Sequence, residues 1–196
     1  MTVAVLGVGV DTVDLGAFAA SLAEPGTRFA GAFSATERRQ CRERAEARGA
    51  GPGTSKSDGD RSSGSRADGD RPGGSRLDGD RSGADRSRGA TSSSSSDQST
   101  PMARHLAARW AVKEAVVKAW SAALYGTPPP ISPDLLVWSE IETVCDAWGR
   151  PAVRLSGEVA RQVAATVGEG ARWNVSLSHD GDSAVAFVVL EGTPTG

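Results

Sequence analysis

Cysteine and histidine are scarce in this sequence, and their scarcity removes several classes of protein. The 196 residues include two cysteines, Cys41 and Cys145, and two histidines. The cysteines lie far apart, and no C-x-x-C pair occurs. A structural zinc site needs four ligands, mostly Cys and His, and a disulfide framework needs several bridges. We therefore expect neither kind of site and interpret both cysteines as ordinary thiols.

Long apolar runs and an excess of charge are also missing. The sequence contains no run of about 20 apolar residues, the length that a membrane-spanning helix needs. Its start, "MTVAVLGVGVDTVD", lacks the basic region and cleavage site of a signal peptide. The formal net charge is −2, and 38% of the residues are hydrophobic. These values are typical of one soluble domain. We expect a cytoplasmic protein that binds neither membranes nor nucleic acid.

Apolar residues nearly vanish between residues 47 and 100. This segment contains three tandem decapeptides with D-G-D-R, then "TSSSSSDQST", and Leu77 is its only large aliphatic residue. Such a composition cannot bury enough apolar surface to offset the entropy of ordering. The repeats lack the third oxygen ligand, the Gly at the sixth position and the Glu at the twelfth position of an EF-hand loop, so calcium is not expected. The sequence predicts a disordered insert over 47–100, interrupting a single domain made of 1–46 and 101–196.

The part before the insert predicts one strand and two helices. The apolar run "VAVLGVGVD" is typical of a buried strand ending at Asp11. A helix is expected over residues 15–23. A second helix should begin at Ser34, because Glu37 follows three residues later and completes a capping box.

The part after the insert predicts a long helix, a hairpin, a short helix and two final strands. The long helix should begin at Pro101 and end before "YGTPPPISP". The expected later elements are a hairpin over 135–155, a helix over 156–168, and strands over 172–179 and 183–191. Strands and helices do not alternate regularly, so α+β is the predicted fold class.

Asp11 is the first candidate for chemistry. It follows Gly7 and Gly9, but this G-x-G lacks the third glycine and the distant acid of a dinucleotide fingerprint. An aspartate where a strand leaves the core can offer an oxygen to a hard cation, and it can equally cap the next helix. The segment alone leaves both readings open.

The stretch "RWAVKEAVVKAW", residues 109–120, supplies the next candidates. Glu114 and Lys118 are four residues apart and share a face of the helix. They could form a surface pair worth tenths of a kcal/mol, or half of an active site. The other charged residues, which include Arg109 and Lys113, are typical of the solvated face of an amphipathic helix.

His179 ends the motif "SLSH" near the end of a predicted strand. A single histidine there is typical of a structural residue. A Ser-His-Asp triad is not predicted, because the sequence has no G-x-S-x-G elbow and the acids near His179 lie in the same turn.

Taken together, the motifs resemble the holo-acyl-carrier-protein synthase family of 4'-phosphopantetheinyl transferases. The matching segments, in the family's order, are "GVGVD", "FSATE", "WAVKEAVVKA", "GRP" and "SLSH". They spread over essentially all of the chain outside the insert, and the helix motif is the most specific. The resemblance implies a 4'-phosphopantetheinyl transferase-like fold, with an antiparallel sheet packed on a long central helix.

The resemblance implies a magnesium-dependent transfer of the phosphopantetheine arm of coenzyme A to a serine of an acyl carrier protein, which serves fatty acid or polyketide synthesis. It assigns Asp11 and Glu114 as Mg²⁺ ligands, which suits an ion that prefers oxygen ligands and keeps several waters. Lys118 would contact the phosphates beside them and act in catalysis with Glu114. Arg109 and His179 would be further phosphate contacts. The general base is either Glu114 or a metal-bound water deprotonated through it.

Two departures and one alternative accompany this resemblance. Many members carry an arginine six residues after the metal-binding aspartate, where this chain has Ala17. Relatives are also short where this chain has its insert. They assemble as trimers with each site between two subunits, and we expect a homotrimer here. The alternative is a non-catalytic coenzyme A or nucleotide-binding module whose insert recruits a partner.

Overall fold

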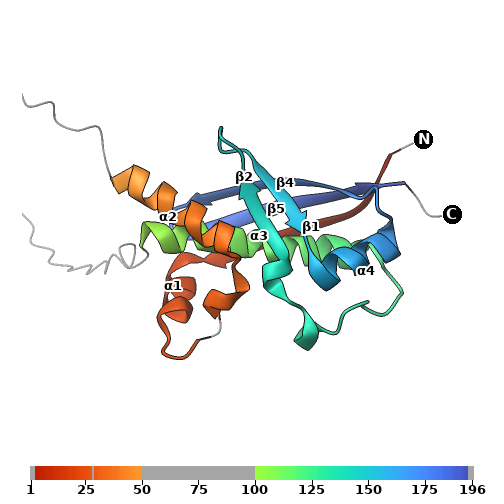
Figure 1. The fold of residues 1–196 in the computed structure, drawn as a ribbon, viewed down its shortest axis with the longest axis horizontal. Helices are drawn as coiled ribbons and strands as arrows, with labels where there is room; N and C mark the ends of the chain where they lie inside the picture. The colour runs from red at the N-terminus through yellow and green to blue at the C-terminus, as the bar shows by residue number, and fades with distance from the viewer. Residues whose placement is uncertain (1–2, 28, 50–99, 194–196) are drawn as a thin grey trace, which may run out of the picture. The chain divides into compact units, whose positions relative to one another are not determined.

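The computed structural model describes residues 3–27, 29–49 and 100–193 (Figure 1). The strands are β1 (Ala4–Asp14), β2 (Ile141–Cys145), β3 (Pro151–Leu155), β4 (Arg172–Asp180) and β5 (Ser183–Gly192). The helices are α1 (Leu15–Ala23), α2 (Ala35–Gly49), α3 (Pro101–Ala123) and α4 (Gly157–Val167). Residues 50–99, most of the expected insert, lie outside the described residues.

The strands form one three-stranded sheet and one hairpin. The sheet has the order β1-β5-β4, and both pairings are antiparallel, while β2 and β3 pair with each other. β1 continues three residues beyond the predicted end, and Asp11 pairs with Ala186 in its interior. The predicted α+β class with an antiparallel sheet on a long helix is confirmed.

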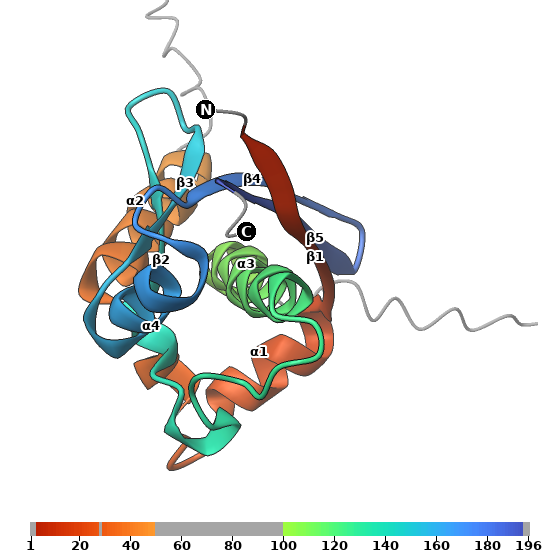
Figure 2. The same cartoon turned by 90° about the vertical axis from the view of Figure 1, so that its right-hand side faces the viewer.

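Helix α3 lies at the centre of this arrangement. Figure 2 looks along it and shows the sheet, the β2–β3 hairpin with α4, and α1 around it. Its buried apolar side chains pack with residues of the sheet, the hairpin and α4. This core includes Ala111, Val112, Ala115, Val116, Ala119, Ile141, Val159, Val188 and Leu190. The enclosure also buries Arg109 and Lys113, so the predicted solvated face is wrong at these two positions.

Two glycines of β1 allow the strand to touch the backbone of α3. A Cβ atom on Gly7 would lie 2.0 Å from the carbonyl oxygen of Ala119, and one on Gly9 would lie 1.9 Å from that of Ala115. Any side chain would therefore push the strand away. Alternate residues of a strand share a face, so Asp11, two residues beyond Gly9, also faces α3. The G-x-G pair thus brings a carboxylate close to the helix.

The capping box of α2 is confirmed, and it belongs to a larger buried network. Ser34 N donates to Glu37 Oε2 (2.9 Å), and Glu37 N donates to Ser34 Oγ (3.1 Å). Lys113 Nζ donates to the same Oε2 (2.9 Å), and Thr143 N donates to Oε1 (3.0 Å). Burial lowers the pKa of Lys113 from its ordinary 10.5, and the Glu37 carboxylate opposes this shift. The pair ties α2 and β2 to α3, and it fixes the rotation of the helix one residue before Glu114.

The predicted hairpin is shorter than expected. Residues 135–140, assigned to its first strand, lie instead in a segment that contains two short 3-10 turns, Pro133–Leu135 and Trp138–Glu140. Glu140 is used there as a cap, because its Oε2 accepts from Val159 N (2.9 Å) in the first turn of α4. That capping contact between distant segments has no local signal in the sequence.

Cys41 is buried and Cys145 is half-buried, and both are free thiols. Burial raises the pKa of the Cys41 thiol to about 11, which keeps it protonated at neutral pH. Within residues 3–27, 29–49 and 100–193, the helices include none that is long and apolar enough for a membrane span.

Candidate active site

Asp11, Glu114 and Lys118 meet where β1 lies against α3. Lys118 Nζ donates to Asp11 Oδ1 (2.7 Å) and to the carbonyl oxygen of Val10 (3.1 Å). Asp11 is only 8% exposed, whereas the Lys118 side chain is 55% exposed. The hydrogen bond with Asp11 is the main cause that raises the pKa of Lys118 and keeps it charged. Lys118 therefore links the helix to the strand and does not serve only as a surface partner of Glu114.

The carboxyl groups of Asp11 and Glu114 lie close enough for Asp11 to affect the protonation of Glu114. The pKa of Glu114 is raised to about 7, first by burial and then by the hydrogen bond and negative charge of Asp11, and Lys118 offsets part of the effect. Asp11 Oδ2 is buried and has no hydrogen-bond donor. Two carboxylates at close range are not both ionised without a cation or a shared proton, and the Lys118 ammonium supplies one positive charge beside this pair.

The donor set fits a magnesium ion. Mg²⁺ is commonly held by one or two carboxylates, with its other positions taken by water and substrate phosphates. Asp11 and Glu114 supply two carboxylates, and no cluster of three or more His, Cys, Asp or Glu suited to a metal occurs among the described residues. An ion at this pair would therefore keep several positions for water and phosphate oxygens.

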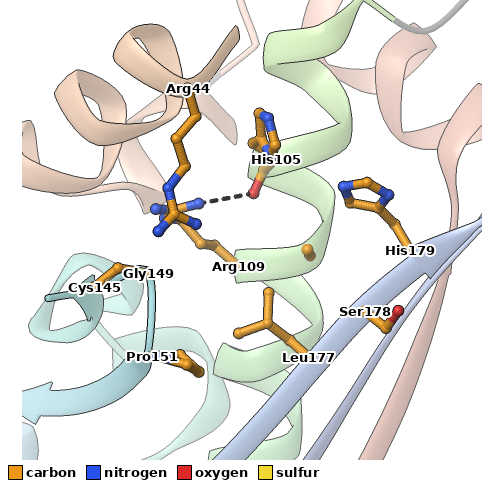
Figure 3. A pocket seen from close by; sticks show the side chains of 10 residues that line it. Arg44, His105, Arg109, Cys145, Gly149, Pro151, Leu177, Ser178 and His179 are labelled. Atoms are coloured by element: carbon orange, nitrogen blue, oxygen red, sulfur yellow. Dashed lines mark hydrogen bonds between the residues drawn. The ribbon is translucent and has the colours of Figure 1, made fainter. Parts of the chain in front are cut away.

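Arg109 and His179 lie elsewhere, in a cleft of about 310 Å³ (Figure 3). Arg44 and His105 also line this cleft, and the described residues that line it include no acidic side chain. Arg109 is almost fully buried, and its Nη1 donates to the carbonyl oxygen of His105 (3.2 Å). The His105 and His179 rings are 5.6 Å apart. Two guanidinium groups and two imidazoles make this cleft suited to an anion.

Sequence analysis did not identify Arg44 and His105 as site residues. Figure 3 shows Arg44 reaching from α2 toward Arg109. A Cβ on Gly149, which has a φ of 86°, would lie 3.3 Å from Arg44 Nη2. The "GRP" turn thus comes close to the guanidinium. These contacts depend on the packing of α2 beside α3, so no local pattern could have revealed them.

Comparison with known proteins agrees with this fold. The family model described as the 4'-phosphopantetheinyl transferase superfamily matches residues 86–188. A holo-acyl-carrier-protein synthase from Corynebacterium glutamicum is 36% identical over 185 residues, which cover 94% of this chain and 97% of that protein. One from Mycobacterium marinum is 34% identical over 188 residues, covering 95% and 97%. This chain belongs to the 4'-phosphopantetheinyl transferase superfamily.

Solved structures confirm the expected fold. The ACPS-CoA complex of Chronobacterium ammoniagenes is 32% identical, with a TM-score of 0.66 over 99% of this chain and 100% of that one. The acyl carrier protein synthase of Mycobacterium tuberculosis is 28% identical, with a TM-score of 0.55 over 97% and 100%. The 4'-phosphopantetheinyl transferase-like fold predicted from the motifs is therefore the fold of this chain.

Proposed function

We propose that this enzyme transfers the 4'-phosphopantetheine arm of coenzyme A to a serine of an acyl carrier protein, and that Asp11, Glu114 and Lys118 form the reacting site. The relatives that match nearly the whole chain are holo-acyl-carrier-protein synthases. The observation that carries the site assignment is the convergence of two carboxylates and an ammonium group from β1 and α3.

The reaction is a displacement at the β-phosphorus of coenzyme A. The serine oxygen forms the new bond, the bond to the bridging oxygen breaks, and adenosine 3',5'-bisphosphate leaves. Mg²⁺ held by Asp11 and Glu114 would neutralise charge on the pyrophosphate and favour in-line attack. Lys118 binds the same phosphate oxygens. Glu114, or a water held beside it, can accept the serine proton.

Mass spectrometry of a carrier protein tests this function. After incubation with the enzyme, coenzyme A and Mg²⁺, the apo carrier protein should gain the mass of one phosphopantetheine. The alternative, a non-catalytic module that only binds coenzyme A or a nucleotide, predicts binding without any gain in mass. A carrier protein whose mass does not change would therefore contradict the proposal.

Lys118→Ala should raise the KM for coenzyme A by about tenfold, because it removes a charge-assisted contact with a phosphate. Steady-state kinetics with the carrier protein held at saturation would measure the effect. Arg161→Ala is a suitable control, since Arg161 pairs with Glu158 on the exposed face of α4. An unchanged KM with a lower melting temperature would instead identify Lys118 as a purely structural partner of Asp11.

We also propose that the enzyme is a homotrimer with each site between two subunits. The separation of the Arg109–His179 cleft from the Asp11–Glu114 pair supports this, because one donor molecule could contact the cleft of one subunit and the carboxylates of the next. The outer face of the sheet offers an interface. It exposes a band of apolar side chains from neighbouring strands, which are Val5, Val8 and Val10 of β1 and Val185 and Phe187 of β5.

Phe187→Asp should convert the trimer into monomers and reduce turnover by at least about tenfold, because it places a charge in the middle of this apolar band. Phe187 is 46% exposed and pairs with Val10, which is 52% exposed. Light scattering after size-exclusion chromatography would give the mass, and circular dichroism would check the fold. Tyr125→Asp, at a side chain that is 95% exposed outside the sheet, is the control. A variant that remains trimeric would exclude this face as the interface.

The predicted insert over 47–100 is too long at both ends, because residues 47–49 continue α2 and Thr100 caps α3. We propose that the rest of this segment is an insert outside the catalytic domain, which its composition supports. We also propose that the enzyme acts in the cytoplasm, where its substrates would be met.

A further inference from the structure

A buried ammonium group lies one residue before Glu114, the proposed metal ligand. The Lys113 side chain is fully buried, and its Nζ donates to acceptors on three different segments. The acceptors are Glu37 Oε2 on α2 (2.9 Å), the carbonyl oxygen of Trp138 (3.0 Å) and the carbonyl oxygen of Ile141 at the start of β2. An ammonium group has three donors, so all of them are used.

We infer, on the basis of the proposed function, that the buried Lys113–Glu37 pair positions the reacting site by holding α3 in the rotation that directs Glu114 toward Asp11. Figure 2 shows α2 and β2 on one side of α3 and β1 on the other. Successive residues of a helix point about 100° apart. Because Lys113 is held toward α2 and β2, Glu114 turns toward β1, where Asp11 lies.

Much of the apolar packing of α3 is made by small side chains. Six of its buried residues are alanines, which are Ala103, Ala107, Ala108, Ala111, Ala115 and Ala119. Small side chains form low ridges that interlock little with neighbouring elements, and apolar attraction has no preferred direction. Hydrogen bonds do have a preferred direction. The three bonds of Lys113 therefore define the rotation of the helix more tightly than these alanines do.

The position of the Glu114 carboxylate is sensitive to this rotation. The end of a side chain lies about 5 to 6 Å from the helix axis, so a turn of about 10° moves it by about 1 Å. Mg²⁺ demands a nearly ideal octahedron with oxygen ligands at about 2.0 to 2.1 Å. A misplacement of about 1 Å can slow a reaction by about 100-fold. A small movement at Lys113 should therefore weaken cation binding and turnover together.

The stability of the fold alone does not require this pair. Apolar residues of similar volume often stabilise a core as well as a buried ion pair does, whereas loss of one partner leaves a buried charge uncompensated. Removal of both charges therefore separates the two roles. A Gln at position 37 can still accept a hydrogen bond from Ser34 N or Thr143 N, which both donate to Glu37 in the native protein.

The double variant Lys113→Met/Glu37→Gln tests the inference, because it removes both charges and keeps the side-chain volumes. Its melting temperature should lie within about 5 °C of the wild type. With coenzyme A present, the EPR signal of free Mn²⁺ should show a Kd raised by about tenfold, and kcat should fall by at least about tenfold. The KM for coenzyme A at saturating Mn²⁺ should change by less than about threefold, because the variant leaves the Arg109–His179 cleft intact.

Arg154→Met is the matched control, since Arg154 pairs with Glu142 across the β2–β3 hairpin (3.6 Å) and is 68% exposed. It should change neither the Kd for Mn²⁺ nor kcat. A double variant with wild-type Mn²⁺ affinity and turnover would overturn the inference and identify the buried pair as purely structural. Wild-type enzyme that binds no Mn²⁺ and transfers nothing would instead contradict the proposed function.

Glu37→Asp covers the case in which the double variant does not fold. It keeps both charges but draws the carboxylate back by one methylene group, about 1.5 Å, so Lys113 must shift to retain the pair. Circular dichroism checks the fold. The Kd for Mn²⁺ should rise by at least about threefold, with a matching fall in kcat. A folded Glu37→Asp variant that binds Mn²⁺ and turns over like the wild type would refute the inference.

Discussion

Glu114→Gln should abolish transfer, with turnover reduced by at least about 100-fold, while the fold remains intact. The amide keeps the shape of the side chain but loses the charge that would hold the cation and the basicity that would accept a proton. Mass spectrometry of the carrier protein at ordinary Mg²⁺ concentration measures the loss. Glu43→Gln, at an exposed position of α2, is the matched control. Full turnover by Glu114→Gln would exclude the metal assignment.

The same variant has a second readout that does not depend on activity. Because the folded protein raises the pKa of Glu114 to about 7, ionisation of this group destabilises the fold as the pH rises from about 4.5 through 7. The amide cannot ionise. At pH 8, without divalent cations, Glu114→Gln should therefore melt at a higher temperature than the wild type. A surface partner of Lys118 would show the opposite sign, with a loss of tenths of a kcal/mol.

Gly9→Ala should destabilise the protein by about 3 kcal/mol or more, which is large for a single methyl group. The added Cβ would lie 1.9 Å from the carbonyl oxygen of Ala115, and neither backbone can move without separating β1 from α3. That movement would also draw Asp11 away from Glu114, so activity should fall together with stability. Urea denaturation at one fixed protein concentration would measure the change in free energy of unfolding.

Gly170→Ala is the control for this experiment, since nothing lies within 4 Å of its Cβ position and its φ is not in the left-handed region. It should change stability by no more than about 1 kcal/mol. If Gly9→Ala were as stable as Gly170→Ala, the close contact between strand and helix would not be what these glycines provide. The two glycines of β1 would then need a different structural explanation.

The sequence by itself determined the elements whose ends carry local signals. Ser34 and Glu37 form the capping box that begins α2, Pro101 begins α3, and Gly168 ends α4 with a φ of 93°. Such signals involve residues a few positions apart, so they act before any tertiary contact forms. The predicted hairpin was too long because residues 135–140 are apolar enough for a strand, yet they form turns whose Trp138 accepts from Lys113 of α3 and whose Glu140 caps α4. The motifs also identified the family and indicated Asp11, Glu114 and Lys118 as candidate site residues.

Only the tertiary structure decided what those residues do. Lys118 lies one helical turn after Glu114, but its ammonium donates to Asp11. This contact is possible because two glycines let β1 approach α3. The helical pattern predicts Lys113 on the surface, but α2 and β2 bury it in an ion pair with Glu37. The physical reason is common to both cases. Helical periodicity reports which residues share a face, whereas burial and charge pairing depend on which distant segments cover that face.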